Sequence, residues 1–246
     1  MIEIINLYKE FVRHPVLRGV NLTIRDGETM VIIGRSGCGK SVLLKHMIGL
    51  MKPDDGQVIV DDEEVSRADE PALRRIRLKF GMLFQAAALF DSLTVGENVA
   101  FPLREHTPME EHAIQERVKE CLGYVGLAGI EHLKPAELSG GMRKRVGLAR
   151  ALAIKPNVIL YDEPTTGVDP IGADAINRLI KGLHDKLKVT GIVVTHDMVS
   201  AYRIADRIAM LHEGRILQVG TVEEIRSTSN PLVRQFILGI SENGGG

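Results

Sequence analysis

The 246-residue chain contains no tryptophan and only two cysteines, Cys38 and Cys121. A pair of cysteines is too few for a disulfide framework or a cysteine-based metal cluster. No apolar run approaches the ~18 residues that a transmembrane helix needs. Lys and Arg number 31 against 32 for Asp and Glu, so the formal net charge is −1, and aromatic residues make up only 4%. A nearly neutral chain with few stacking side chains suits a nucleic-acid backbone poorly, so we expect no nucleic-acid partner.

The N-terminal stretch carries Glu3 and Lys9 and has no long apolar segment, so we expect no secretory signal. Hydrophobic residues make up 44% of the chain, which together with the small net charge excludes extensive disorder. These features predict a folded, soluble protein of a reducing compartment, the cytoplasm. Only residues 241–246 (SENGGG) are expected to form a flexible tail.

Strand and helix patterns alternate along the chain and predict an α/β fold with an antiparallel β piece near the N-terminus. The strands are expected at 2–6, 20–24, 29–33, 57–60, 157–162, 191–195, 207–211 and 215–219. The helices are expected at 40–50, 110–125, 171–187 and from about 198. The stretch 86–155 is expected to form a mostly helical lobe inside a single domain that covers 1–240.

A glycine-rich loop follows the expected strand 29–33 and precedes an apolar helix. Its residues are Gly34, Arg35, Ser36, Gly37, Cys38, Gly39, Lys40 and Ser41, which fit the phosphate-loop pattern G-x-x-x-x-G-K-S. Glycines let backbone N–H groups converge on phosphate oxygens, and the helix N-terminus adds its positive end. Lys40 supplies a charge for the phosphates, and the Ser41 hydroxyl is suited to Mg²⁺. Cys38 is interpreted as a small tolerated side chain or as a redox switch.

Polar residues also follow three apolar segments further along the chain. Asp162 ends the expected strand 157–162 and Glu163 follows it; an Asp there can hold Mg²⁺, and a Glu can polarise a water molecule. Adjacent carboxylates also occur at strand ends for structural reasons, but a preceding phosphate loop favours the metal role. His196 follows the strand 191–195 and Gln85 follows the apolar GMLF. Each is either an ordinary surface residue or a contact for the γ-phosphate, the metal ion or the attacking water.

The segment 138–142 (LSGGM) precedes a helix that is expected to begin near Arg143. Ser139 is a residue type typical of helix N-caps, and paired glycines expose the backbone. The segment is either an ordinary cap or a second phosphate-binding helix N-terminus. The basic run 143–145 is interpreted as a solvated helix face.

Together these motifs resemble the ATP-binding subunit of ABC (ATP-binding cassette) transporters over essentially the whole chain. The matching residues, in the family's order, are 34–41 (Walker A), Gln85 (Q-loop), 138–142 (signature), 159–163 (Walker B and catalytic Glu), 167–169 (D-loop) and His196 (switch histidine). Phe11 occupies the place of the aromatic residue that stacks on adenine. The resemblance implies a P-loop NTPase fold with a mixed RecA-like core, an antiparallel β subdomain and a helical subdomain.

The resemblance also implies ATP and Mg²⁺ as cofactors. The implied nucleotide-binding residues are Phe11, Gly34, Arg35, Ser36, Gly37, Cys38, Gly39, Lys40, Ser41, Val42, Ser139, Gly140 and Gly141. The implied metal ligands are Ser41, Gln85 and Asp162, and the implied catalytic residues are Glu163, His196 and Gln85. In this family the signature of one subunit completes the ATP site of the other, which implies a head-to-tail homodimer.

A narrower resemblance links the chain to the ATPases of Mla and Mce phospholipid transport systems. It is carried by 81–107, 139–153 and 233–240, and by Met142, where many ABC ATPases have Gln. This group implies a polytopic permease (MlaE-like), an MCE-domain lipid-binding protein (MlaD-like) and a STAS-domain subunit (MlaB-like). It places the chain peripherally at the cytoplasmic face of the inner membrane. In this fold, the groove behind the Q-loop receives the permease.

Two other readings stay open at this stage. The first is an ABC ATPase that serves an importer of amino acids or metals. A sugar importer is disfavoured because little chain follows the last expected strand at 215–219, too little for a regulatory domain. The second is a nucleotide-binding scaffold without turnover, against which Asp162, Glu163 and His196 argue. Single-cassette length and the lack of a coiled-coil insertion disfavour DNA-repair and translation proteins of the family.

Overall fold

The computed structural model describes residues 1–240, so the tail predicted at 241–246 lies outside the described residues. The chain divides into two compact units. The first contains Met1–Ala68 and the chain from Val194 onward, and the second contains Asp69–Val193. The predicted helical stretch 86–155 lies inside the second unit, which begins earlier and ends later than that prediction.

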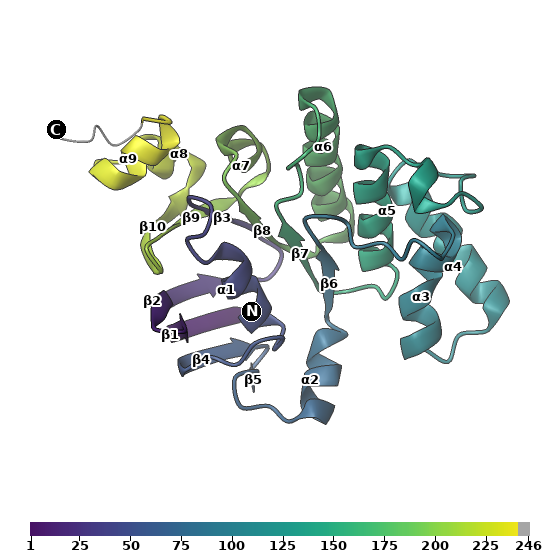
Figure 1. Cartoon of the computed structure of the whole chain (residues 1–246), viewed down its shortest axis with the longest axis horizontal. Helices are drawn as coiled ribbons and strands as arrows, with labels where there is room; N and C mark the ends of the chain where they lie inside the picture. The colour runs from purple at the N-terminus through teal and green to yellow at the C-terminus, as the bar shows by residue number, and fades with distance from the viewer. Residues whose placement is uncertain (241–246) are drawn as a thin grey trace. The chain divides into compact units, whose positions relative to one another are not determined.

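The first unit begins with an antiparallel four-stranded sheet of order β2-β1-β4-β5 (Figure 1). Its strands are β1 (Ile2–Phe11), β2 (His14–Ile24), β4 (Asp55–Val60) and β5 (Glu63–Glu64). Val12 and Arg13 join β1 to β2 with φ values of 44° and 64°. Because paired left-handed residues match the twist of a hairpin, β1 and β2 extend to the turn, further than the predicted strands 2–6 and 20–24.

Three more strands of the first unit are ordered β10-β9-β3. They are β3 (Thr29–Ile33), β9 (Arg207–His212) and β10 (Arg215–Thr221). All five residues of β3 are buried, and β3 runs parallel to β9, as is typical of a strand that is covered on both faces. The helices of this unit are α1 (Lys40–Met47), α7 (Met198–Ile204), α8 (Val222–Arg226) and α9 (Pro231–Ile237).

The second unit places strands in the order β8-β7-β6 and adds a group of helices. Its strands are β6 (Phe80–Leu83), β7 (Val158–Asp162) and β8 (Thr190–Thr195), whose last two residues belong to the first unit. Its helices are α2 (Glu70–Arg77), α3 (Val95–His106), α4 (Glu111–Tyr124), α5 (Gly140–Leu152), α6 (Pro170–Leu187) and the 3₁₀ turn Pro135–Glu137. Helices α3, α4 and α5 pack against one another, in teal in Figure 1.

Most predicted elements are confirmed within a few residues, and the start of α5 is the clearest correction. The sequence predicted this helix near Arg143, whereas it begins at Gly140. The Ser139 Oγ accepts a hydrogen bond from the Met142 N–H at 3.2 Å. A side-chain cap at Ser139 starts the helix at the next residue and overrides the low helix propensity of the two glycines.

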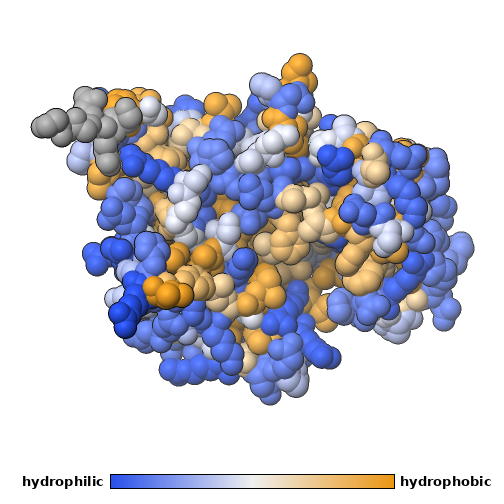
Figure 2. All heavy atoms as spheres, viewed as in Figure 1, coloured by the Kyte–Doolittle hydropathy of each residue, from blue (hydrophilic) through white to orange (hydrophobic). Residues whose placement is uncertain are grey.

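Hydrophilic residues cover much of the surface seen in Figure 2, with hydrophobic residues in smaller groups between them. No helix among residues 1–240 combines the length and the apolar character needed to cross a bilayer.

Asn98 organises the loop that precedes α3. The Asn98 side chain is fully buried. Its Nδ2 donates to the carbonyls of Phe90 (3.1 Å), Leu93 (3.3 Å) and Thr94 (2.9 Å). Its Oδ1 accepts a hydrogen bond from the Phe90 N–H at 2.9 Å. Thr94 and Glu97 add a reciprocal capping box at the same helix end.

Asn98→Ala should lower the free energy of unfolding by about 2–3 kcal/mol, because it leaves buried backbone groups without partners. Urea denaturation followed by circular dichroism measures the change. Gln115→Ala, on the exposed side of α4, is the matched control and should stay within about 0.5 kcal/mol of the unaltered chain. Equal stability of the two variants would contradict this role of Asn98.

Candidate functional site

The predicted phosphate loop connects β3 to α1 in the first unit; a side chain would clash at Gly34 and would crowd its neighbours at Gly39. A Cβ on Gly34 would lie 2.3 Å from the Leu211 carbonyl oxygen of β9. A Cβ on Gly39 would lie 3.1 Å from the Val16 carbonyl oxygen of β2, and its φ of 106° is one that other residues rarely adopt. The loop is therefore packed tightly against β9 at Gly34 and against β2 at Gly39, both of which are buried.

Lys40 is buried, and its ammonium lies over this backbone. Its Nζ donates to the carbonyls of Gly34 at 2.8 Å and Arg35 at 3.1 Å. Lys40 begins α1, and the residue before it, Gly39, offers no side chain to cap the helix. A buried cation beside an uncapped helix N-terminus is suited to an anion with several oxygens, such as a polyphosphate. Ser41 and Val42 follow in the first turn, both half-buried.

The structure brings His196 together with this loop. His196, Arg35 and Ser36 line one hollow of about 660 Å³ in the first unit. The remaining lining comes from the C-terminal part of the chain, including Gln235 and Phe236 of α9. This participation of α9 was not predicted, because nothing in the spacing of its residues relates it to the loop.

Phe11 ends β1, with its ring partly exposed, directly before the hairpin turn. The same hairpin continues into β2, which touches Gly39 at Val16 and Leu17. The predicted adenine-stacking residue and the predicted phosphate loop thus belong to one unit and are linked by direct packing.

The predicted carboxylates lie at the end of β7 in the second unit. Asp162 is the last residue of the strand, as predicted, and both Asp162 and Glu163 are only 8% exposed. Glu163 has a φ of 49°, a strained left-handed conformation for this residue type. The Thr166 hydroxyl donates to the Glu163 Oε2 at 3.1 Å. The turn therefore fixes the direction of the Glu163 side chain.

The buried position of Lys144 corrects the interpretation of 143–145 as a solvated helix face. Lys144 is buried, and its Nζ donates to the Glu163 carbonyl oxygen at 3.0 Å. Burial lowers the pKa of Lys144, while the charges of Glu163 and Asp162 oppose that shift. Lys144 therefore ties α5 to the strained turn that carries the predicted catalytic carboxylate. Within the run 143–145, Lys144 is the buried residue, and the charge pattern by itself did not indicate which of the three would be buried.

The predicted signature residues surround the N-terminus of α5. Ser139 and Gly140 are exposed and Gly141 is half-buried. A Cβ on Gly140 would come no closer than 3.9 Å to another group, the carbonyl oxygen of Gly167 in the predicted D-loop. Unlike Gly34 and Gly39, these glycines are not forced by packing within the second unit. Their absent side chains leave open backbone at a helix N-terminus.

Gln85 is exposed just after β6. The loop that follows Gln85 is held by Arg150, a residue that the sequence motifs did not single out. Arg150 of α5 donates to the carbonyls of Ala87 at 2.8 Å and Ala88 at 2.7 Å. Both alanines have positive φ, 60° and 47°, so Arg150 stabilises an otherwise unfavourable bend.

An apolar groove of about 480 Å³ lies beside this loop. Phe90 and Phe101 pack across it with ring centroids 4.9 Å apart. The groove is lined by Phe80, Gly81, Met82, Phe84, Ala88, Phe90, Phe101, Pro102, Arg150, Ala151 and Ile154. Much of this lining falls in the segment 81–107 that resembles the Mla and Mce ATPases.

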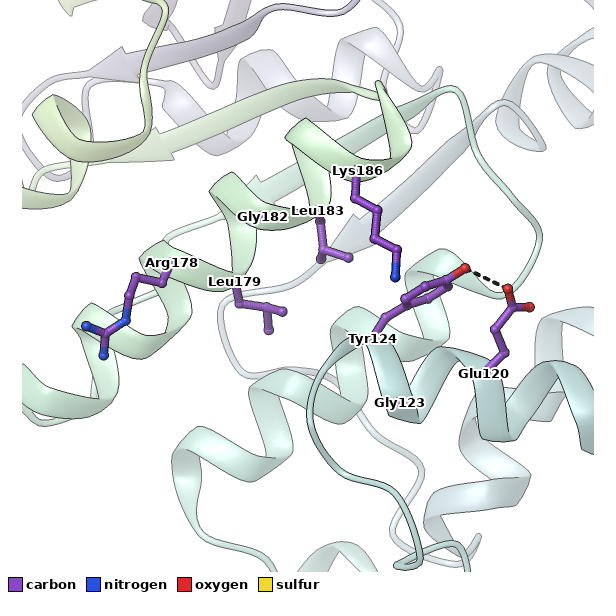
Figure 3. Close-up of a pocket in the computed structure, with 8 residues that line it drawn as sticks. All are labelled: Glu120, Gly123, Tyr124, Arg178, Leu179, Gly182, Leu183 and Lys186. Carbon is purple, nitrogen blue, oxygen red and sulfur yellow. Dashed lines mark hydrogen bonds between the residues drawn. The ribbon is translucent and has the colours of Figure 1, made fainter.

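A separate pocket between α4 and α6 contains none of the predicted site residues (Figure 3). The Tyr124 hydroxyl donates to Glu120 at 2.6 Å, and the Lys186 ammonium lies 4.7 Å from the Tyr124 ring centroid. These contacts within the pocket wall stabilise the packing of the two helices.

The predicted site residues thus divide between the two units. The first carries Phe11, the phosphate loop and His196, and the second carries Gln85, the signature, Asp162 and Glu163. Within the described chain, no group of three or more His, Cys, Asp and Glu side chains is placed to hold a metal ion. The predicted Mg²⁺ ligands contain only one carboxylate, so phosphate oxygens and water would have to complete the coordination.

A family model described as "ABC transporter" matches residues 17–166. The chain belongs to the ABC transporter family. It is 39% identical, over 98% of its length and 92% of the relative, to the "Intermembrane phospholipid transport system ATP-binding protein MlaF" of Haemophilus influenzae. It is 42% identical, over 97% of its length, to the "Probable ribonucleotide transport ATP-binding protein mkl" of Mycobacterium tuberculosis, and it spans 66% of that relative.

A solved structure described as the dimeric, post-hydrolysis state of the ATP-binding cassette MJ0796 bound to ADP and Pi is similar to the chain. The TM-score is 0.83 at 35% identity, covering 90% of this chain and 99% of the other. This similarity confirms the predicted fold class. The chain is an ATP-binding cassette, and the family's activity is ATP hydrolysis.

The two cysteines provide a direct test of the phosphate loop. Cys38 is half-buried within the loop, whereas Cys121 is fully buried, and burial raises the pKa of the Cys121 thiol to about 11. N-ethylmaleimide should therefore modify Cys38 and leave Cys121 intact in the folded protein. ATP at about ten times its Kd should slow the modification of Cys38 roughly tenfold, because it occupies the loop.

Mass spectrometry of the alkylated protein over time measures both rates, and Cys38→Ser identifies the reacting thiol. Modification of Cys38 at the same rate with and without ATP would show that the nucleotide binds elsewhere.

Proposed function

We propose that the chain is the ATP-hydrolysing subunit of an ABC transporter that moves phospholipids between the inner membrane and the cell envelope. The observation that carries this proposal is the similarity to the phospholipid-transport ATPase over nearly the full length of both chains. The resemblance of the segment 81–107, which lines the apolar groove beside Gln85, supports the same substrate class.

The polyphosphate of ATP binds at the loop 34–41 in this proposal. Lys40 and the N-terminus of α1 offset its negative charge, and Ser36 and the loop N–H groups donate to its oxygens. The residues that would hold Mg²⁺ are Ser41 of the first unit and Gln85 and Asp162 of the second, whose hydroxyl, amide and carboxylate oxygens are ligands that Mg²⁺ accepts. Phosphoryl transfer to water then depends on positioning and electrostatics and needs no covalent intermediate.

Glu163 acts on the attacking water as a general base or an orienting group. Its low exposure and its hydrogen bond from Thr166 favour a single side-chain direction. The contact from Lys144 keeps the turn at Glu163 in its strained conformation. His196 lines the same hollow as Ser36 and Arg35, so it is suited to contact the γ-phosphate end of a bound nucleotide.

We propose that two identical chains assemble head to tail, so that Ser139, Gly140 and Gly141 of one subunit complete the ATP site of the other. The chain carries one phosphate loop and one signature. The exposed backbone at the start of α5 and the uncrowded glycines suit a ligand presented by a second subunit. The solved relative at TM-score 0.83 is dimeric, which supports this arrangement.

The apolar groove beside Gln85 is the proposed docking surface for a polytopic permease. Its phenylalanines and Met82 offer an apolar surface for a short helix of the permease, and Arg150 links the groove to the loop that follows Gln85. Such a link would let docking and hydrolysis influence each other. In this proposal an MCE-domain lipid-binding protein and a STAS-domain subunit complete the transporter, and the chain lies peripherally at the cytoplasmic face of the inner membrane.

Glu163→Gln should bind ATP with a Kd within about threefold of the unaltered chain while kcat falls by at least about 10²-fold, because an amide cannot accept the proton of the attacking water. Phosphate release measures kcat, and size-exclusion chromatography with ATP should show an accumulated dimer. Glu116→Gln, exposed on α4, is the control and should leave kcat unchanged. Normal turnover by Glu163→Gln would remove Glu163 from the mechanism.

The substrate class is tested by purifying the chain from its native membrane together with the proteins that adhere to it. Mass spectrometry should identify a polytopic permease, an MCE-domain protein and co-purifying phospholipids. Recovery of a soluble amino-acid-binding or metal-binding protein would instead assign the ATPase to another transported substrate.

A further inference from the structure

Lys9 lies beside the predicted base-stacking residue. Its Nζ is 5.6 Å from the ring centroid of Phe11, two residues further along β1. This distance is within the range of a cation–π interaction, in which an ammonium lies over the face of an aromatic ring. Phe11 is 40% exposed, so part of its ring remains accessible to a ligand.

Asp54 holds the Lys9 side chain and the β1 backbone in place at the same time. Its Oδ1 accepts from Lys9 Nζ at 2.7 Å, and its Oδ2 accepts from the Glu10 N–H at 2.6 Å. The hydrogen bond from Lys9 lowers the pKa of Asp54, as expected for an ion pair. Lys9 Nζ also donates to the Lys52 carbonyl at 3.0 Å, and the Lys9 side chain is only 15% exposed. The ammonium is therefore fixed on both sides, unlike a typical surface lysine.

Lys9 pairs with a strand that packs against the phosphate loop, and it lies near the helix that follows the loop. Leu17, the partner of Lys9 in the strand pairing, is one of the residues that Gly39 packs against. On the other side, burial and the nearby charge of Lys9 both lower the pKa of His46 on α1, although the Val42 carbonyl opposes that shift. Lys9 thus belongs to the same packed region as the proposed polyphosphate site.

We propose that Lys9 is a positioning residue for the nucleobase: held by Asp54, its ammonium fixes the Phe11 ring so that the accessible part of the ring stacks on the base of bound ATP. The proposal rests on the proposed function, since it assumes that ATP occupies the loop 34–41. It assigns to Lys9 a role in binding the base and none in cleaving the phosphate.

The test compares ATP with inorganic tripolyphosphate, which offers phosphate oxygens but no base. Isothermal titration calorimetry should show that Lys9→Met binds ATP about two- to fivefold more weakly and binds tripolyphosphate as the unaltered chain does. Steady-state ATPase assays should show KM raised by a similar factor with kcat unchanged. Lys9→Arg, which keeps a cation able to stack on an aromatic ring, should restore ATP affinity.

Phe11→Ala provides the test that Lys9 acts through the ring. In this background Lys9→Met should cause no further loss of ATP affinity, because the group that Lys9 positions is gone. If Lys9→Met fails to fold, Asp54→Asn tests the same role of Lys9. It keeps an oxygen for the Glu10 N–H, weakens the hold on Lys9, and should lower ATP affinity but not tripolyphosphate affinity. Lys119→Met, exposed on α4, is the matched control.

Several results would overturn the proposal while leaving the ATPase assignment intact. These are unchanged ATP affinity in folded Lys9→Met, equal losses for ATP and tripolyphosphate, or additive losses for Lys9→Met and Phe11→Ala. If the unaltered chain binds neither ATP nor tripolyphosphate, the proposed function itself fails.

Discussion

The close approach of Gly34 to the Leu211 carbonyl is the constraint on which the candidate site depends. A Cβ on residue 34 would lie only 2.3 Å from the Leu211 carbonyl oxygen, so no residue other than glycine fits unless β3 and β9 move apart. The parallel pairing of those strands, with Ile33 opposite Met210, then fixes where the loop leaves the sheet. A loop that is held this tightly presents its backbone N–H groups in one arrangement, so little conformational entropy is lost when phosphate oxygens bind.

In the second unit, hydrogen bonds hold the predicted catalytic carboxylate, Glu163, in place. Glu163 is strained, and the strain is held by Lys144 on its carbonyl and by Thr166 on its carboxylate. Lys144 belongs to α5, which begins at Gly140 directly after the Ser139 cap, so the helix that carries the signature segment also contacts the turn that carries the carboxylate. A movement of α5 would be transmitted to the turn at Glu163 through the hydrogen bond from Lys144. Arg150, further along α5, supports the loop after Gln85 in the same way.

These contacts give one helix three functional connections. Its N-terminus carries the proposed surface for a second subunit, its middle holds the carboxylate turn, and its C-terminal half lines the groove proposed for the permease. Coupling between transport and hydrolysis needs an element with such connections, because a signal at the groove must reach the chemistry through contiguous packing. In the first unit, the hairpin of β1 and β2 has an analogous role, since it contacts the loop at Gly39 and carries Phe11.

The sequence by itself determined the motifs and the local elements that carry them. The strand 29–33, Asp162 at the end of β7 and the glycine pattern of the loop could be predicted, because burial and backbone conformation leave a direct trace in residue type. It could not fix the start of α5, since the Ser139 cap competes with the helix-breaking tendency of the glycines.

Only the tertiary structure decided which side chains support the site from a distance. Lys144 and Arg150 look like ordinary basic residues of a helix, and their roles come from the turns packed against them. The ion pair of Lys9 with Asp54 likewise joins β1 to a residue 45 positions away along the chain. Such contacts depend on how elements pack in three dimensions, and a periodicity along the chain records only which face of an element is buried.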